Sequence, residues 1–150
     1  NTSYFKIPTF KKIVKIIDFG RATFTNNKQL YFSNVFNNNG DAEGQYDFPK
    51  NNSLKYCKIK PNFSFDLARL STTIIEHFDK TNDIHTLLKS WITNKSGYSV
   101  YNHEDDFELY KNIAKYMNNA VPKHQLENPL FKPFTVSKKD IPNNAFIYTY

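Results

Sequence analysis

The sequence predicts an α+β fold that is mainly α-helical. Three observations lead to this class. Two short runs rich in β-branched and aromatic residues precede Asp18. From Asp18 to Pro61 the chain has little periodicity, and from Phe63 onward apolar residues recur at helical spacing. The predicted order is therefore a β-hairpin, a long irregular segment and a helical subdomain.

The first run is Tyr4-Phe5-Lys6-Ile7, and the second covers residues 12–17. Both have the composition of strands, and Pro8-Thr9 between them favours a turn. We expect the two runs to pair as a hairpin within residues 1–17.

Asparagine and glycine interrupt the segment from Asp18 to Pro61, as in Asn26-Asn27 and residues 37–41. Stretches of more than forty residues without a long regular element are usually functional when they occur inside a compact domain. This segment is therefore the first place to look for a site.

Three apolar faces then follow the helical period, and each predicts a helix packed on a common core. Ser64 and Asp83 are the expected N-caps of the first two helices, and the acidic residues 104–106 suit the first turn of the third. The faces consist of Leu67, Leu70, Ile74, Ile75 and Phe78; of Ile84, Leu87, Leu88, Trp91 and Ile92; and of Phe107, Tyr110, Ile113, Ala114 and Met117.

The composition excludes several classes of protein. A chain of 150 residues that is 39% hydrophobic and 17% aromatic is not a disordered chain. One cysteine excludes a disulfide scaffold and a cysteine-based zinc site. The longest apolar run, residues 13–17, is interrupted by Lys15 and is too short to span a membrane. No signal-peptide pattern is present, so we expect an intracellular protein.

The net charge of +6 comes almost entirely from lysine, with 18 Lys and 2 Arg. The lysines are scattered and form no continuous stripe, which favours a solvated surface and makes nucleic acid an unlikely partner. Binding to nucleic acid is a third hypothesis, and it predicts that the affinity falls steeply as the salt concentration rises. The excess of Lys, Asn, Ile, Phe and Tyr indicates an A/T-rich genome.

The sharpest motif is Asp18-Phe19-Gly20, which follows the second predicted strand. Phosphoryl-transfer enzymes hold a carboxylate rigidly at a strand end, where it binds the Mg²⁺ that bridges the nucleotide phosphates. A glycine just after it lets the following loop change direction. Asp18 is therefore the candidate metal ligand.

At this motif the chain resembles the C-terminal lobe of a protein kinase. Residues 16–22 resemble the strand and metal-binding motif that open the activation segment. Tyr46-Asp47-Phe48-Pro49-Lys50 resembles the motif that closes it, with Tyr46 and Pro49 matching. Phe48 replaces the usual alanine and Lys50 the usual glutamate, and neither arginine, Arg21 or Arg69, lies late enough to pair with that glutamate.

Two further stretches carry the resemblance, which runs over roughly residues 4–135. Residues 64–71 are similar to the start of the central helix of the kinase lobe, and the resemblance makes Asp66 the structural anchor that hydrogen-bonds the catalytic loop. Residues 126–131 resemble a turn near the end of kinase domains. The implied layout is one partial domain, with a hairpin at 1–17, an activation segment at 18–50 and a helical subdomain at 51–150.

The resemblance is to divergent serine/threonine kinases of large DNA viruses. It implies Mg²⁺ and ATP as cofactors, a protein substrate, and a location in the host cytoplasm or the virion. Thr23, Thr25 and Ser33 lie where kinases accept activating phosphates. The alternative is a pseudokinase, or a structural module of the virion, that retains the lobe as a scaffold.

Several elements of a working kinase do not occur in the sequence: the Gly-rich loop, the strand lysine and the catalytic-loop Asp and Asn. In kinases they all precede the position of Asp18. We therefore expect this chain to lack the N-terminal lobe and to contain no catalytic residue. It would transfer phosphate only together with an upstream half, in the same or a separate chain, and Mg²⁺ and ATP would bind only there.

Overall fold

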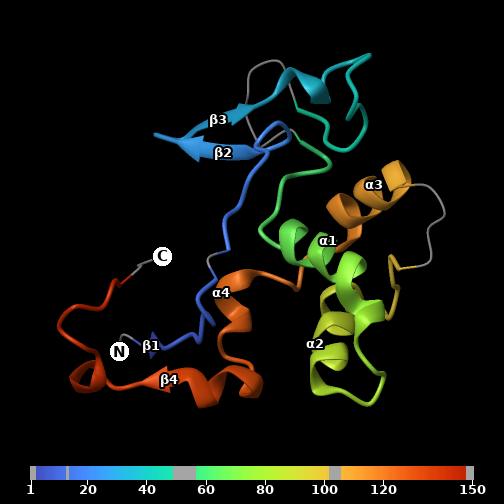
Figure 1. Cartoon of the computed structure of the whole chain (residues 1–150). Helices are drawn as coiled ribbons and strands as arrows, with labels where there is room; N and C mark the ends of the chain where they lie inside the picture. The colour runs from blue at the N-terminus through green and yellow to red at the C-terminus, as the bar shows by residue number, and fades with distance from the viewer. Residues whose placement is uncertain (1–2, 13, 49–56, 102–105, 148–150) are drawn as a thin grey trace.

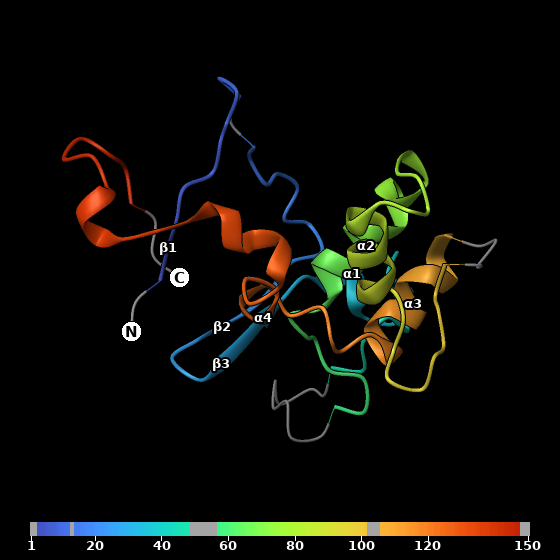
Figure 2. The same cartoon turned by 90° about the horizontal axis from the view of Figure 1, so that it is seen from below.

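The computed structural model has the mixed α+β fold that the sequence predicts (Figure 1). It describes residues 3–12, 14–48, 57–101 and 106–147. The principal helices are α1 (Phe65–Ile74), α2 (Asp83–Trp91), α3 (Asp106–Tyr116) and α4 (Pro122–Gln125). Figures 1 and 2 show that α1, α2 and α3 form one helical body, and that the strands lie outside it.

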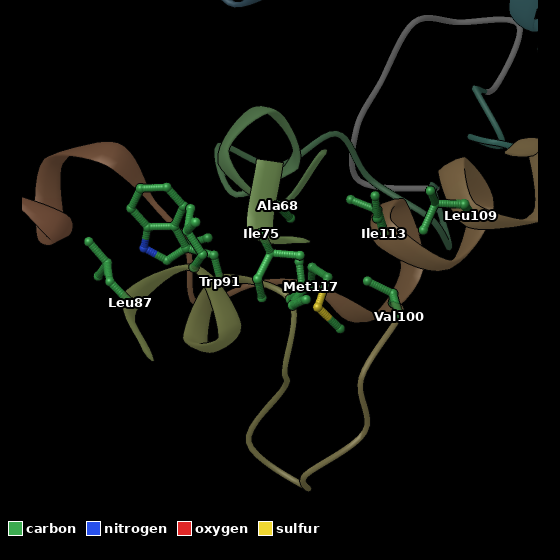
Figure 3. Close-up of a cluster of buried hydrophobic side chains, with 11 residues drawn as sticks. Ala68, Ile75, Leu87, Trp91, Val100, Leu109, Ile113 and Met117 are labelled. Carbon is green, nitrogen blue, oxygen red and sulfur yellow. The ribbon is translucent and has the colours of Figure 1, made fainter. Parts of the chain in front are cut away.

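The helical body forms because the three apolar faces meet in one core. Trp91 from α2, Ile113 from α3 and Ala68 from α1 are all buried in it. Figure 3 shows Ile75, at the end of α1, and Met117, just after α3, side by side at its centre. Inside the core the Ser71 hydroxyl donates to the Leu88 carbonyl oxygen at 2.7 Å and ties α1 to α2. Most of the predicted core positions of these helices are confirmed, but Leu70 on α1 and Ile84 on α2 are 47% and 42% exposed, so the apolar faces are narrower than predicted.

Polar side chains fix the ends of these helices, although not always the expected ones. Ser64 precedes α1 as expected, but its side chain makes no capping bond; Asn62 Oδ1 accepts from the Ser64 backbone N–H at 2.9 Å instead. The cap of α2 is Asn82, whose Oδ1 accepts from the Ile84 N–H at 2.8 Å, and Asp83 is the first helical residue. A short amide side chain can reach these backbone donors as well as a carboxylate can.

The expected hairpin within residues 1–17 is wrong. β1 (Tyr4–Phe5) pairs antiparallel with β4 (Thr135–Val136), and the Lys6 N–H donates to the Phe134 carbonyl oxygen at 2.7 Å. Residues 12 and 14–17 form no strand. The first run is thus paired with a segment about 130 residues away, because β propensity selects strand-forming residues but not their partner.

A hairpin does form, but after Asp18. β2 (Thr23–Asn26) pairs with β3 (Gln29–Phe32), and Figure 1 shows the pair projecting from the top of the molecule. The two turn residues, Asn27 and Lys28, both have positive φ, at 47° and 66°. This is the backbone of a type I′ turn, whose twist matches that of paired strands.

Short 3-10 helices make up most of the remaining regular structure. They are η1 (Asn34–Phe36), η3 (Ile75–His77), η4 (Pro129–Phe134) and η5 (Lys138–Asp140). Asn128 caps η4 by accepting from the Leu130 N–H at 3.0 Å. Every helix within the described residues is too short or too polar to cross a lipid bilayer.

Candidate functional site

Asp18-Phe19-Gly20 lies in an irregular segment that leads into β2. Asp18 has a left-handed backbone, with φ of 62°, and its Oδ1 accepts from the Gly20 N–H at 3.2 Å. The Ala22 N–H then donates to the Phe19 carbonyl oxygen at 2.9 Å. Aspartate tolerates this conformation because its short side chain bonds to the backbone two residues on. The motif therefore forms two consecutive tight turns.

The rigid strand end that we expected before Asp18 is absent from the described residues. Ile16 and Ile17 are 83% and 78% exposed, and the ring of Phe19 is also largely exposed. Without a paired strand, the local turn rather than a sheet determines where the Asp18 carboxylate points.

Asp18 can supply one oxygen ligand to a cation. Its carboxylate is exposed, and within the described part of the chain Oδ1 alone accepts a backbone hydrogen bond. Mg²⁺ is often held by one or two carboxylates together with substrate phosphates, so a single accessible carboxylate fits the expected chemistry. Among the described residues no group of three or more His, Cys, Asp or Glu side chains could hold a metal ion. The role of Asp18 as a magnesium ligand stays a prediction.

Both ends of the segment between Asp18 and Phe48 pack on the helical body. At its start, the Arg21 guanidinium lies over the ring of Tyr110 on α3, with Cζ 5.2 Å from the ring centroid. At its end, the ring of Tyr46 lies 6.4 Å from that of Phe65, the first residue of α1. The hairpin β2–β3 lies between these two anchor points in the sequence.

The end of the segment is held by four aromatic rings, which we call the aromatic cluster: Phe32, Phe36, Tyr46 and Phe48. Phe36 and Tyr46 are buried, and Ala42 and Ala114 are buried beside them. Next to the cluster, both carboxylate oxygens of Asp47 accept backbone N–H groups, from Lys58 at 2.6 Å and from Ile59 at 2.5 Å. The cluster closes residues 32–48 into a packed loop.

Burial raises the pKa of Tyr46 to about 12, and the nearby carboxylate of Asp66 adds to the increase. Tyr46 therefore stays neutral at physiological pH and acts as a packing residue here. Pro49, the other residue expected to mark the end of the activation segment, lies outside the described residues.

Asp66 lies in the first turn of α1, as the resemblance implies, but its side chain is exposed. The resemblance implies that the Asp66 side chain hydrogen-bonds the backbone of the catalytic loop, which we expect to lie outside this chain. Its role as a structural anchor stays a prediction.

The three candidate phosphate acceptors have different surroundings. Thr25 is exposed on β2, and Thr23 is partly buried at the start of the same strand. Ser33 caps η1 by accepting from the Val35 N–H at 3.4 Å, so its hydroxyl already has a structural role. Thr25 is the most accessible of the three.

Sequence reasoning missed the meeting of Arg21, Arg69 and Tyr110. The Arg69 guanidinium, on α1, also lies over the Tyr110 ring with Cζ 5.2 Å from the centroid. The sequence indicates only that neither arginine lies late enough to pair with the glutamate of a closing motif. The scarcity of arginine, two residues against 18 lysines, is the signal that could have drawn attention to them.

Comparisons with known proteins returned no matching family model, no similar curated protein and no similar solved structure.

Proposed function

We propose that this chain is part of the C-terminal lobe of a divergent protein kinase, an enzyme that transfers phosphate from ATP to protein serine or threonine. The observation that carries the proposal is Asp18-Phe19-Gly20 followed by a segment whose two ends, at Arg21 and Tyr46, pack on α3 and α1. An activation segment has this arrangement, since it begins at a metal-binding aspartate and closes against the helical lobe.

In this proposal Asp18 would hold Mg²⁺ against the β- and γ-phosphates of ATP when the nucleotide is bound. The left-handed turn at Asp18 and the Gly20 N–H fix one carboxylate oxygen and leave the other for the metal. The residue that orients the substrate hydroxyl would come from the upstream half of the kinase. A large DNA virus is the proposed source, and the host cytoplasm or the virion the proposed location.

Two observations favour a second candidate, a pseudokinase or a structural module of the virion. Phe48, which stands where kinases have alanine, packs in the aromatic cluster. Both arginines lie against Tyr110, so neither can serve the ion pair that closes the activation segment of active kinases. In this candidate the lobe persists as a packing scaffold without catalysis.

Magnesium-dependent ATP binding separates the two candidates. The measurement is calorimetric titration of ATP, with and without Mg²⁺, into the polypeptide that joins this chain to its proposed upstream half. The kinase proposal predicts binding that requires Mg²⁺ and is lost in Asp18→Asn, with Asp140→Asn as the matched control on η5. Absence of nucleotide binding with the upstream half present would exclude the enzyme and leave the scaffold.

A further inference from the structure

The two arginines of the chain converge on one aromatic ring from different elements. Arg21 follows the turn at Gly20, Arg69 lies on α1, and Tyr110 lies on α3. Each guanidinium carbon is 5.2 Å from the Tyr110 ring centroid, so the two carbons are separated by no more than twice that distance. The ring attracts each cation through its π face, but it does not neutralise the charge.

Neither guanidinium forms a salt bridge with a carboxylate within the described residues. The one salt bridge found there joins Lys111 to Glu108. Arg69 uses Nη1 to donate to the hydroxyls of Thr72 at 3.1 Å and Thr73 at 2.6 Å. Two guanidinium groups thus lie against one ring, and neither has a carboxylate partner among the described residues.

Arg69 also keeps a donor that nothing in the described structure satisfies. Its Nε is buried and has no hydrogen-bond acceptor. A buried donor without a partner is unfavourable by the cost of removing it from water, and more so for a charged group. An anion with several oxygens beside Tyr110 would supply the missing acceptor and offset the repulsion between the two cations.

We infer that Arg21 and Arg69 form an anion site that takes a phosphate monoester. Guanidinium groups bind tetrahedral phosphate oxygens in pairs, and a dianion compensates two arginines where a carboxylate compensates one. The site lies on Arg21, Arg69 and Tyr110, and it does not depend on nucleotide binding at Asp18. The phosphate comes from a free small molecule or from a phosphorylated side chain of a protein.

Asp66 sets the affinity of this site. It lies three residues before Arg69 on the same helix, where side chains at this spacing are neighbours, and its carboxylate is exposed. A negative charge there opposes the incoming anion. Removal of that charge in Asp66→Asn should therefore tighten phosphate binding, which a merely structural role of the arginines would not cause.

The test is calorimetric titration of three probes into the polypeptide carrying residues 1–150: inorganic phosphate, O-phosphoserine within a short peptide, and acetate. We expect saturable phosphate binding, weaker acetate binding, and a loss of about tenfold or more in phosphate affinity in Arg21→Lys and Arg69→Lys. Lysine keeps the positive charge but lacks the planar guanidinium group. The loss of affinity therefore measures what the guanidinium geometry contributes to phosphate binding. Tighter binding of the phosphopeptide than of inorganic phosphate assigns the site to a protein ligand, and equal binding assigns it to a small molecule.

Lys89→Gln is the matched control, because it removes a positive charge from the exposed end of α2. Its phosphate affinity should equal that of the unaltered chain. Arg21 is exposed, so Arg21→Lys reports on the site even where Arg69→Lys fails to fold. The inference is overturned when phosphate does not bind, or when Arg21→Lys and Lys89→Gln bind it equally well.

Discussion

The ring of Phe48 stacks on the ring of Phe32, with centroids 4.1 Å apart and planes inclined by 18°. This contact joins the end of β3 to the end of the segment that begins at Asp18. It closes the loop on which η1 and Ala42 lie, and it holds Tyr46 against Phe65. Phe48, the residue for which the kinase resemblance implies an alanine, is thus a packing residue of this loop.

Phe48→Ala should therefore destabilise the fold. Truncation of a fully buried phenylalanine costs about 3–5 kcal/mol, and Phe48 is half-buried, so we expect a loss of about 2 kcal/mol in the free energy of unfolding. Denaturant unfolding followed by circular dichroism measures it. Phe63→Ala is the control, because Phe63 is 81% exposed and should cost little. Equal losses in the two variants would contradict the packing role of Phe48.

Tyr46 should make stability fall at high pH. Its pKa is raised to about 12 in the folded chain, above the ordinary value of 10.0, so the native state keeps a proton that the unfolded state loses. The stabilisation is complete below pH 10 and decreases as the pH rises from about 10 to about 12. The measurement is the free energy of unfolding against pH for the unaltered chain and for Tyr46→Phe. Their difference should change over this window, and a constant difference would show that Tyr46 titrates normally.

The exposed apolar side chains before Asp18 should make the isolated chain self-associate. Val14, Ile16 and Ile17 are 94%, 83% and 78% exposed and are close together in the sequence. Exposed apolar patches of this kind mark surfaces that another chain covers. Replacement of all three residues by threonine should lower the weight-average molecular mass that sedimentation equilibrium gives at high protein concentration. It should leave the melting temperature unchanged.

The control for that experiment is Phe146→Thr, which removes a side chain that is 92% exposed near the other end of the chain. In the polypeptide that includes the proposed upstream half, we expect residues 14–17 to be protected from hydrogen exchange by an upstream strand. An isolated chain that stays monomeric at high concentration would contradict the predicted self-association.

Gln125 should be required for the packing of Trp91. The indole N–H donates to Gln125 Oε1 at 2.7 Å, and Gln125 Nε2 donates to the Asn119 carbonyl oxygen at 3.0 Å. Gln125→Ala leaves a largely buried indole donor without an acceptor, which should cost about 1–3 kcal/mol and change the emission of the single tryptophan. Lys123→Ala, on the exposed side of α4, should change neither the stability nor the emission.

The helices could be predicted from the sequence because their apolar faces repeat over several turns. Leu87, Leu88 and Trp91 are buried as the period predicts. The strand partners could not be predicted, because Tyr4 has the same β propensity whether it pairs with a neighbour or with Val136. The turn at Asn27-Lys28 was missed because lysine is an unusual residue for a left-handed position.

The candidate site could be predicted only in part. Asp18 was singled out by its motif, and its turn follows from the properties of aspartate and glycine. The contacts of Arg21, Arg69 and Tyr110 join three segments far apart in the sequence, and no local pattern encodes them. Nothing in the spacing of Phe32, Phe36 and Phe48 distinguished a closing cluster from the other aromatic residues of the core.

The kinase proposal depends on the Asp18 carboxylate binding the metal of a metal–nucleotide complex. The most direct measurement is paramagnetic broadening of amide resonances by Mn²⁺ in the polypeptide that includes the upstream half. With ATP present, the proposal predicts broadening centred on residues 18–20 that disappears in Asp18→Asn. Bound nucleotide with unbroadened resonances at Asp18, Phe19 and Gly20 would contradict it.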